Sequence, residues 1–143
     1  MFPVEIITPE EVIYKGEADS LTLPTGDGEI TVLTGHIPLI TTLVPGTIFL
    51  KTGKEETVFA VSRGVVEITR EDTRILAQTA DRADTLEEAA IEKAKEKAEK
   101  LMSEKRQDAE AFAEASAVLE RELARLKTVR RHRSRSRGPT LPS

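Results

Sequence analysis

Glu29 and His36 come nearest to an acid–base pair in this sequence. Both lie in the segment GDGEITVLTGHIPLI, residues 26–40. A carboxylate and an imidazole can transfer protons, but a hydrolase or lyase also needs a nucleophile or a metal within their reach. The second histidine, His132, lies in a basic segment near the end of the chain, and cysteine is absent. The sequence therefore predicts no catalytic residue and no metal site.

The glycines and the proline of residues 26–40 support a different role for the histidine. They are typical of turns between antiparallel strands, and an imidazole can order such a turn through local hydrogen bonds. A turn of this kind can also present His36 to a partner. Replacing His36 by Ala would abolish turnover in an enzyme, whereas a docking residue would affect assembly instead.

The bases Arg121, Arg125 and Lys127 form a second group of candidate residues. On a helix, an acid pairs best with a base four residues later, and neither Glu120 nor Glu122 has a base at that spacing. A solvated helix face is one interpretation. The lack of such pairs favours the other, in which unpaired bases bind an external anionic partner.

The charge of the chain is divided between an acidic body and a basic end. Residues 127–143 hold six of the 21 Lys and Arg and no acid, which leaves 15 bases against 25 acids, a net charge of −10, in residues 1–126. An acidic body repels phosphate, so no nucleic-acid partner is expected. Trp is absent and only five residues are Phe or Tyr, which also opposes a surface for stacking bases.

The elements that position these residues change character near residue 83. Before it, β-branched residues alternate with polar ones, and turn residues recur every eight to ten positions. This pattern predicts many short antiparallel strands, in a sandwich or a barrel. Residues 1–10 lack the positive region and the long apolar run of a signal peptide, and no apolar run approaches the roughly 20 residues that cross a bilayer. The chain is therefore expected to be soluble and intracellular.

Residues 83–129 contain no Gly or Pro and are dominated by strong helix formers. Asp84 or Thr85 is predicted to cap the start of the helix. Glu87 or Glu88 would complete a capping box by reaching back to the free N–H of the cap.

The polar segment SEKRQD, residues 103–108, divides this helical stretch. Two helices could fold back there into a hairpin, with Asp108 capping the second. One continuous helix over residues 85–129 is the alternative, and it would extend about 68 Å. The apolar stripe is rich in Ala, and each buried methyl contributes only about 0.8 kcal/mol. The hairpin is thus either a static pair packed on the sheet or a two-state element that opens readily.

Four short motifs occur in a characteristic order: Gly-Glu-Ala-Asp (16–19), Asp-Gly-Glu (27–29), Gly-His-x-Pro-Leu (35–39) and Leu-x-Pro-Gly (43–46). With them, roughly residues 3–129 resemble the epsilon subunit of bacterial and chloroplast F-type ATP synthases. The departures fall in turns: Thr31, Thr34 and Arg63 stand where the family usually has Gly, Pro and Gly. They are predicted to change neither fold nor role.

The resemblance implies an α+β fold made of a β-sandwich and a helical hairpin, and a third part follows them in this chain. Residues 1–83 would form an antiparallel β-sandwich of about ten strands, and residues 84–130 a regulatory helical hairpin. Residues 131–143 are predicted, from their composition, to be a basic, disordered tail. Family members commonly stop near residue 130, so the resemblance implies nothing about that tail.

The resemblance also implies a role as a non-catalytic rotor subunit in the central stalk of a proton-translocating ATP synthase. Its partners would be the gamma subunit and the c-ring, met through loops that hold Glu29 and His36. The hairpin would reach the alpha/beta hexamer when extended, through Arg121, Arg125 and Lys127, and would hinder ATP hydrolysis. The subunit would lie on the cytoplasmic face of the cell membrane as a peripheral protein. The alternative is a stand-alone interaction module whose basic tail binds nucleic acid or an anionic membrane.

Family members that bind ATP carry Ile/Leu-Asp-x-x-Arg-Ala at the start of the hairpin. Leu86 matches the first position, and Glu87 keeps the acidic charge of the second. Ala90 replaces the Arg and removes a cation suited to phosphate. Arg121 and Arg125 match positions that assist in those members. The resemblance therefore implies no cofactor, and weak or no ATP binding by the isolated subunit.

Overall fold

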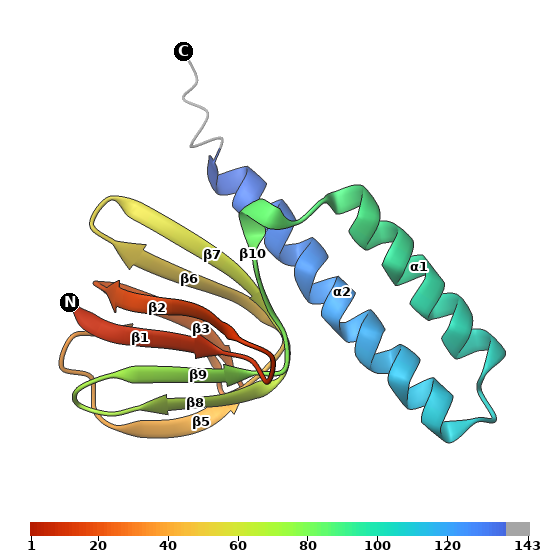
Figure 1. Ribbon diagram of the computed structural model, residues 1–143, viewed down its shortest axis with the longest axis horizontal. Helices are drawn as coiled ribbons and strands as arrows, with labels where there is room; N and C mark the ends of the chain where they lie inside the picture. Colours follow the sequence, from red (N-terminus) through yellow and green to blue (C-terminus); the bar gives the residue numbers. More distant parts are fainter. Residues whose placement is uncertain (137–143) are drawn as a thin grey trace, which may run out of the picture.

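A computed structural model describes residues 1–136 of the chain, without the side chains of residues 135 and 136 (Figure 1). Within this range ten strands precede a 3-10 turn and two helices, which confirms the predicted α+β fold. The strands are β1 (Phe2–Ile7), β2 (Val12–Ala18), β3 (Ser20–Thr25), β4 (Gly28–Leu33), β5 (Leu39–Leu43), β6 (Gly46–Thr52), β7 (Glu55–Val61), β8 (Gly64–Ile68), β9 (Thr73–Ala77) and β10 (Ala80–Arg82). The turn η1 (Ala83–Thr85) leads to α1 (Glu88–Glu104) and α2 (Ala109–Ser136).

The strands form one curled sheet in the order β10-β7-β6-β3-β5-β8-β9-β1-β2, with β4 attached to β3. Figure 1 shows that the sheet folds over on itself into two facing layers. Neighbouring strands are antiparallel except β1 and β9, which run parallel with Val4 opposite Thr73. The prediction of an antiparallel sandwich misses this pair because no local turn connects its strands.

The core lies between the layers, and it is made by the inward-facing half of each alternating strand. Phe59 of β7 is fully buried, and its ring packs edge-on against Tyr14 with the centroids 5.8 Å apart. The other large buried side chains come from all parts of the sheet: Val4, Ile6, Leu21, Leu23, Leu43, Ile48, Leu50, Val66, Ile68 and Ile75.

Gly64 lies where the neighbouring backbone leaves no room for a side chain. It pairs with Leu43 of β5 on one side and with Ala77 of β9 on the other. A methyl group added there would overlap the backbone carbonyl of Leu76. Glycine is therefore required at this position for lack of space, whatever its backbone angles.

The start of α1 differs from its prediction. Glu87 is the cap residue, and no side chain accepts a hydrogen bond there. The predicted capping residues Asp84 and Thr85 instead belong to η1, where the Thr85 hydroxyl donates to the carbonyl of Arg82. The capping box is wrong because the chain first makes a 3-10 turn against the sandwich.

The two helices form the predicted hairpin, with their turn in the segment SEKRQD. A carboxylate oxygen of Asp108 accepts a hydrogen bond of 3.1 Å from the N–H of Ala111, which confirms the predicted cap of α2. Helix α2 continues to Ser136 and so includes the first six residues of the predicted disordered tail. The rest of the predicted tail, residues 137–143, lies outside the described residues.

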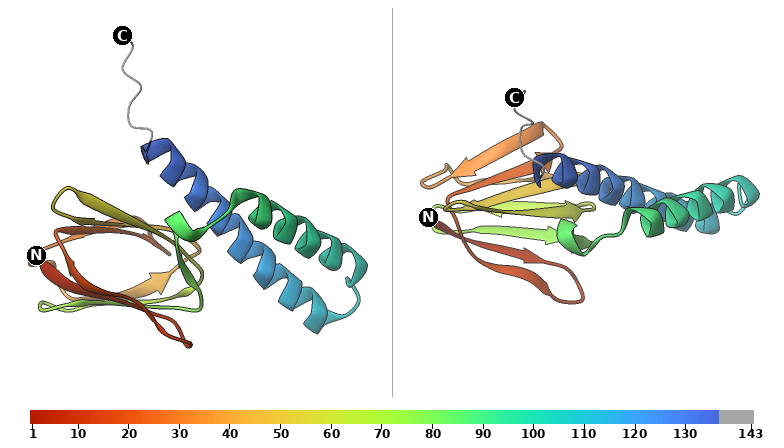
Figure 2. Two further views of the ribbon diagram at one scale, coloured as in Figure 1. Left: turned by 45° about the horizontal axis from the view of Figure 1, so that its top comes forward. Right: turned by 90° about the horizontal axis from the view of Figure 1, so that it is seen from above.

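The hairpin packs against the sandwich mainly through α2. Figure 2 shows α2 lying between the strands and α1, with the turn of the hairpin projecting beyond the sandwich. The C-terminal half of α2 covers the outer face of β6 and β7, where Phe49, Val58 and Ala83 are buried together.

Candidate functional site

Glu29 and His36 do not form an acid–base pair. Glu29 is the second residue of β4, whereas His36 lies in the turn after that strand, held by a hydrogen bond of 3.1 Å from its N–H to the carbonyl of Leu33. Leu33 lies four positions after Glu29 along the strand, which puts their Cα atoms about 13 Å apart. No proton can pass directly between groups so far apart.

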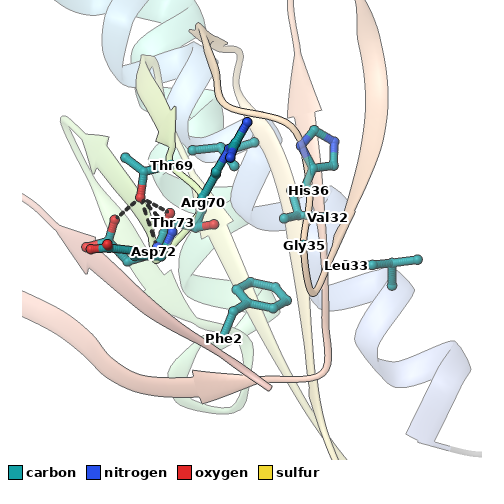
Figure 3. Close-up of a pocket in the computed structure, with 11 residues that line it drawn as sticks. Phe2, Val32, Leu33, Gly35, His36, Thr69, Arg70, Asp72 and Thr73 are labelled. Carbon is teal, nitrogen blue, oxygen red and sulfur yellow. Dashed lines mark hydrogen bonds between the residues drawn. The ribbon is translucent and has the colours of Figure 1, made fainter.

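The cavity beside His36 is also too small for a substrate. Figure 3 shows His36 and Gly35 on one side of it, and on the other the hydrogen-bonded turn of Thr69 and Asp72. Its volume is about 10 Å³, scarcely room for one water molecule. The His36 Nδ1 atom lies 2.6 Å from the carbonyl oxygen of Ile37, to which it donates. The ring thus orders its own turn, as the structural interpretation predicts.

Strand β4 is nevertheless exposed in a way that suits docking. In the part of the chain that the structure describes, β4 pairs along its length with β3 alone, so its other edge is open. Beyond its end, Ile37 and Ile40 are 78% and 72% exposed. We call residues 28–40, with this open edge and these apolar side chains, the β4 edge. Contiguous exposed apolar residues next to unpaired backbone groups are typical of an interface.

The prediction that the hairpin bases are unpaired is wrong for Arg121 and Arg125. The Arg121 Nε lies 3.3 Å from a carboxylate oxygen of Glu122, and Arg125 donates to the same carboxylate at 3.0 Å. Arg125 also binds Asp81 of β10 at 2.8 Å. The i,i+4 rule misses these pairs because Glu122 lies one residue after Arg121 and three residues before Arg125. Asp81 lies on another element. Lys127 is exposed and makes no ion pair among the described residues.

Glu122 is the most deeply buried charged side chain of the helices, with only 2% of it exposed. Leu86, Glu87 and Ala90 line a groove at the start of α1, and Glu122 and Arg125 of α2 line it as well. The remnant of the nucleotide motif and one arginine thus lie together, as the resemblance implies. The cation in that groove is already paired with carboxylates of the chain itself.

Two further contacts fix α2 on the sandwich, and sequence reasoning missed both. The hydroxyls of Thr47 and Thr128 share a hydrogen bond of 2.7 Å and are buried. Arg63 donates from Nε and from a terminal nitrogen to the carboxylate of Glu120, at 3.0 and 2.9 Å. The hydrogen bond and the charge of Glu120 raise the pKa of Arg63. The unusual Arg before Gly64 therefore has a partner, although it was predicted to be only a turn substitution.

Residues 1–136 contain no group of three or more His, Asp or Glu side chains placed to hold a metal ion. Neither α1 nor α2 has an apolar stretch long enough to span a bilayer.

Comparison with known proteins gives matches along nearly the whole chain. Residues 1–83 match the family described as ATP synthase, Delta/Epsilon chain, beta-sandwich domain. The ATP synthase epsilon chain of Acinetobacter baumannii (strain ATCC 17978) is 40% identical over 134 residues, covering 92% of this chain and 95% of the relative. That of Chromohalobacter salexigens is 36% identical over 135 residues, covering 94% and 95%.

The fold also resembles a chain in the cryo-EM structure of Euglena gracilis mitochondrial ATP synthase, OSCP/F1/c-ring. The TM-score is 0.69 and the identity 22%, over 83% of this chain and 75% of the other. At that identity the likeness supports the fold and nothing finer.

Proposed function

The chain belongs to the ATP synthase epsilon chains, and we propose that it acts as a non-catalytic rotor subunit of the central stalk. In that role it couples rotation of the c-ring to ATP synthesis. The observation that carries the proposal is the identity of 36% and 40% to epsilon chains over more than nine-tenths of the sequence. The separation of Glu29 from His36 supports the non-catalytic part.

The proposed partners are the gamma subunit and the c-ring, and the proposed contact surface is the β4 edge. Glu29 lies near the start of β4 and His36 just beyond its end, so the β4 edge includes both residues. As a peripheral subunit of the complex, the protein is proposed to lie at the cytoplasmic face of the cell membrane.

Replacing Ile37 by Asp tests this surface. Ile37 is 78% exposed, so the change should not disturb folding, but it places a charge within the proposed contact. We expect the amount of gamma and c-ring that copurifies with the subunit to fall about tenfold, the size of a hot-spot effect. His36→Ala should have a smaller effect, because its ring bonds its own turn.

Val12→Asp is the matched control, since Val12 is 55% exposed on β2, the last strand of the order, whereas β4 is attached to β3. Equal recovery of gamma with the Ile37→Asp and unaltered chains would contradict the proposed surface. Failure of the unaltered chain to copurify with gamma would contradict the rotor function itself.

We also propose that the isolated subunit binds ATP weakly or not at all. Ala90 supplies no cation, and Arg125 is held by Asp81 and Glu122, so a phosphate would have to displace two carboxylates. Isothermal titration of the purified chain with ATP should show no saturable heat. A dissociation constant in the micromolar range would contradict the prediction.

The alternative, a stand-alone module that binds nucleic acid or membrane through a basic tail, is less well supported. Arg130, Arg131 and Arg133 of the predicted basic segment pair with acids of the chain itself. Their charge is therefore partly neutralised within the molecule.

A further inference from the structure

The last turns of α2 carry three arginines that bind two different parts of the molecule. Arg130 donates to Glu88 at 3.0 Å and to Glu92 at 3.2 Å, and Arg133 also binds Glu88. Glu88 and Glu92 lie on the first turns of α1. Since residues three or four apart share one face of a helix, a pair of arginines on α2 meets a pair of acids on α1.

Arg131 points to the sandwich instead. Its guanidinium lies 4.5 Å from the centre of the Phe49 ring on β6, and 3.8 Å from the carboxylate of Glu29 on β4. A guanidinium over an aromatic face gains cation–π attraction, and the nearby carboxylate adds to it. The same helical turn of α2 thus contacts α1 on one side and the sandwich on the other.

The helix dipoles favour this arrangement. In an antiparallel hairpin the N-terminus of α1 lies beside the C-terminal half of α2. Acids at the N-terminus of α1 and basic residues near the C-terminus of α2 each interact favourably with the dipole of their own helix. The charges also occupy the base of the hairpin, where α1 joins the sandwich through η1.

The rest of the hairpin seam is thinly packed. At the base, Ile91 is buried against Leu126 and Val129. Nearer the turn, the buried seam residues are small, Ala98 and Ala115, and two grooves lie along it. Closure of the hairpin therefore depends strongly on its base, where the three arginines are.

We propose that Arg130, Arg131 and Arg133 form an electrostatic latch that keeps the hairpin closed on itself and docked on the sandwich. Two of them hold α1 to α2, while the third holds α2 to β4 and β6. The latch is built largely from partly exposed side chains, so salt and competing anions weaken it. Any effect of an open latch on ATP hydrolysis would depend on the proposed role in ATP synthase. The effect of the latch on the position of the hairpin does not depend on that role.

The test measures hairpin position in the purified full chain. The sequence has no cysteine, so spin labels can be attached uniquely at Lys54→Cys in the turn after β6 and Lys93→Cys on α1. Both positions are exposed. Pulsed electron–electron resonance then gives the distribution of distances between sandwich and hairpin.

In the latch variant, Arg130, Arg131 and Arg133 are all changed to Gln. The ratio of open to closed chains should rise about tenfold, as expected for loss of several partly exposed ion pairs. The unaltered chain should open similarly at about 1 M NaCl, where the screening length falls to about 3 Å. The latch variant should respond little to salt.

A charge-matched control changes Lys97, Lys105 and Arg106 to Gln, three exposed bases that make no ion pair among the described residues. It should leave the distances unchanged. A partner-side variant, Glu88→Gln with Glu92→Gln, should open the hairpin without altering α2. Distances unaffected by the latch variant, in chains whose thermal unfolding shows an intact sandwich, would overturn the proposal. So would equal opening in the control.

Discussion

Gly64→Ala is expected to destabilise the sandwich by more than about 4 kcal/mol, among the largest effects a single substitution produces. Gly64 lies in β8 between β5 and β9, and the added methyl group would overlap the carbonyl of Leu76. That atom belongs to the backbone, so no side-chain rotation can relieve the overlap. The strands must separate, and the ladder hydrogen bonds on at least one side are lost.

Urea unfolding followed by circular dichroism measures this effect as a lowered midpoint, or as a chain too unstable to purify. Val65→Ala is the control at the next position, where the side chain is 42% exposed. It should change the free energy of unfolding by less than about 1 kcal/mol. A midpoint for Gly64→Ala close to that of Val65→Ala would show that the strands can spread at little cost.

Arg125→Met is expected to release the hairpin. The change leaves Glu122, 2% exposed, without its strongest partner, and removal of one member of a buried ion pair typically costs about 3–5 kcal/mol. It also breaks the contact with Asp81 that ties α2 to β10. The chain can avoid the cost by undocking α2, which returns Glu122 to water. We therefore expect an open hairpin on an intact sandwich.

Amide hydrogen exchange should show loss of protection in α1 and α2, with that of the sandwich retained. In the assembled enzyme, the released hairpin should lower ATP hydrolysis if it is the inhibitory element that the resemblance implies. Lys127→Met is the matched control, because Lys127 is an exposed base of the same helix with no ion pair in the described part of the chain. Protection of α2 that survives Arg125→Met would mean that the apolar contacts at its base suffice.

Local patterns predict the elements of this protein well. Alternation and turn residues predict the strands, and the polar segment at residues 103–108 predicts the break between the helices. Asp108 caps α2 as expected, because its hydrogen bond to Ala111 spans only three residues. Each of these features depends on residues that are close together in the sequence, so the local sequence pattern is enough to predict it.

Contacts between distant residues were not predictable in the same way. Arg63 and Glu120 pair across the fold, as do Asp81 and Arg125. Spacing along one helix cannot reveal such partners, so the pair of Arg125 with Asp81 was missed. Arg121 and Arg125 were also wrongly predicted to be unpaired because their shared partner Glu122 lies one residue after the first and three residues before the second, which the i,i+4 spacing does not cover. The capping box failed for a related reason, because packing against the sandwich draws Asp84 and Thr85 into a 3-10 turn. The roles of Glu29, His36 and Lys127 in assembly remain predictions.

The parallel pairing of β1 with β9 has a consequence for how the protein is made. Strand β1 leaves the ribosome before the other strands, but one of its two sheet partners, residues 73–77, follows only after most of the sandwich has been synthesised. Pairings between distant segments form slowly, because a long loop must close, with a loss of conformational entropy, before the strands can make their stabilising contacts. Translation therefore leaves one edge of β1 open until β9 emerges, and docking of α2 must come later still. The nascent chain is most prone to aggregation in that interval.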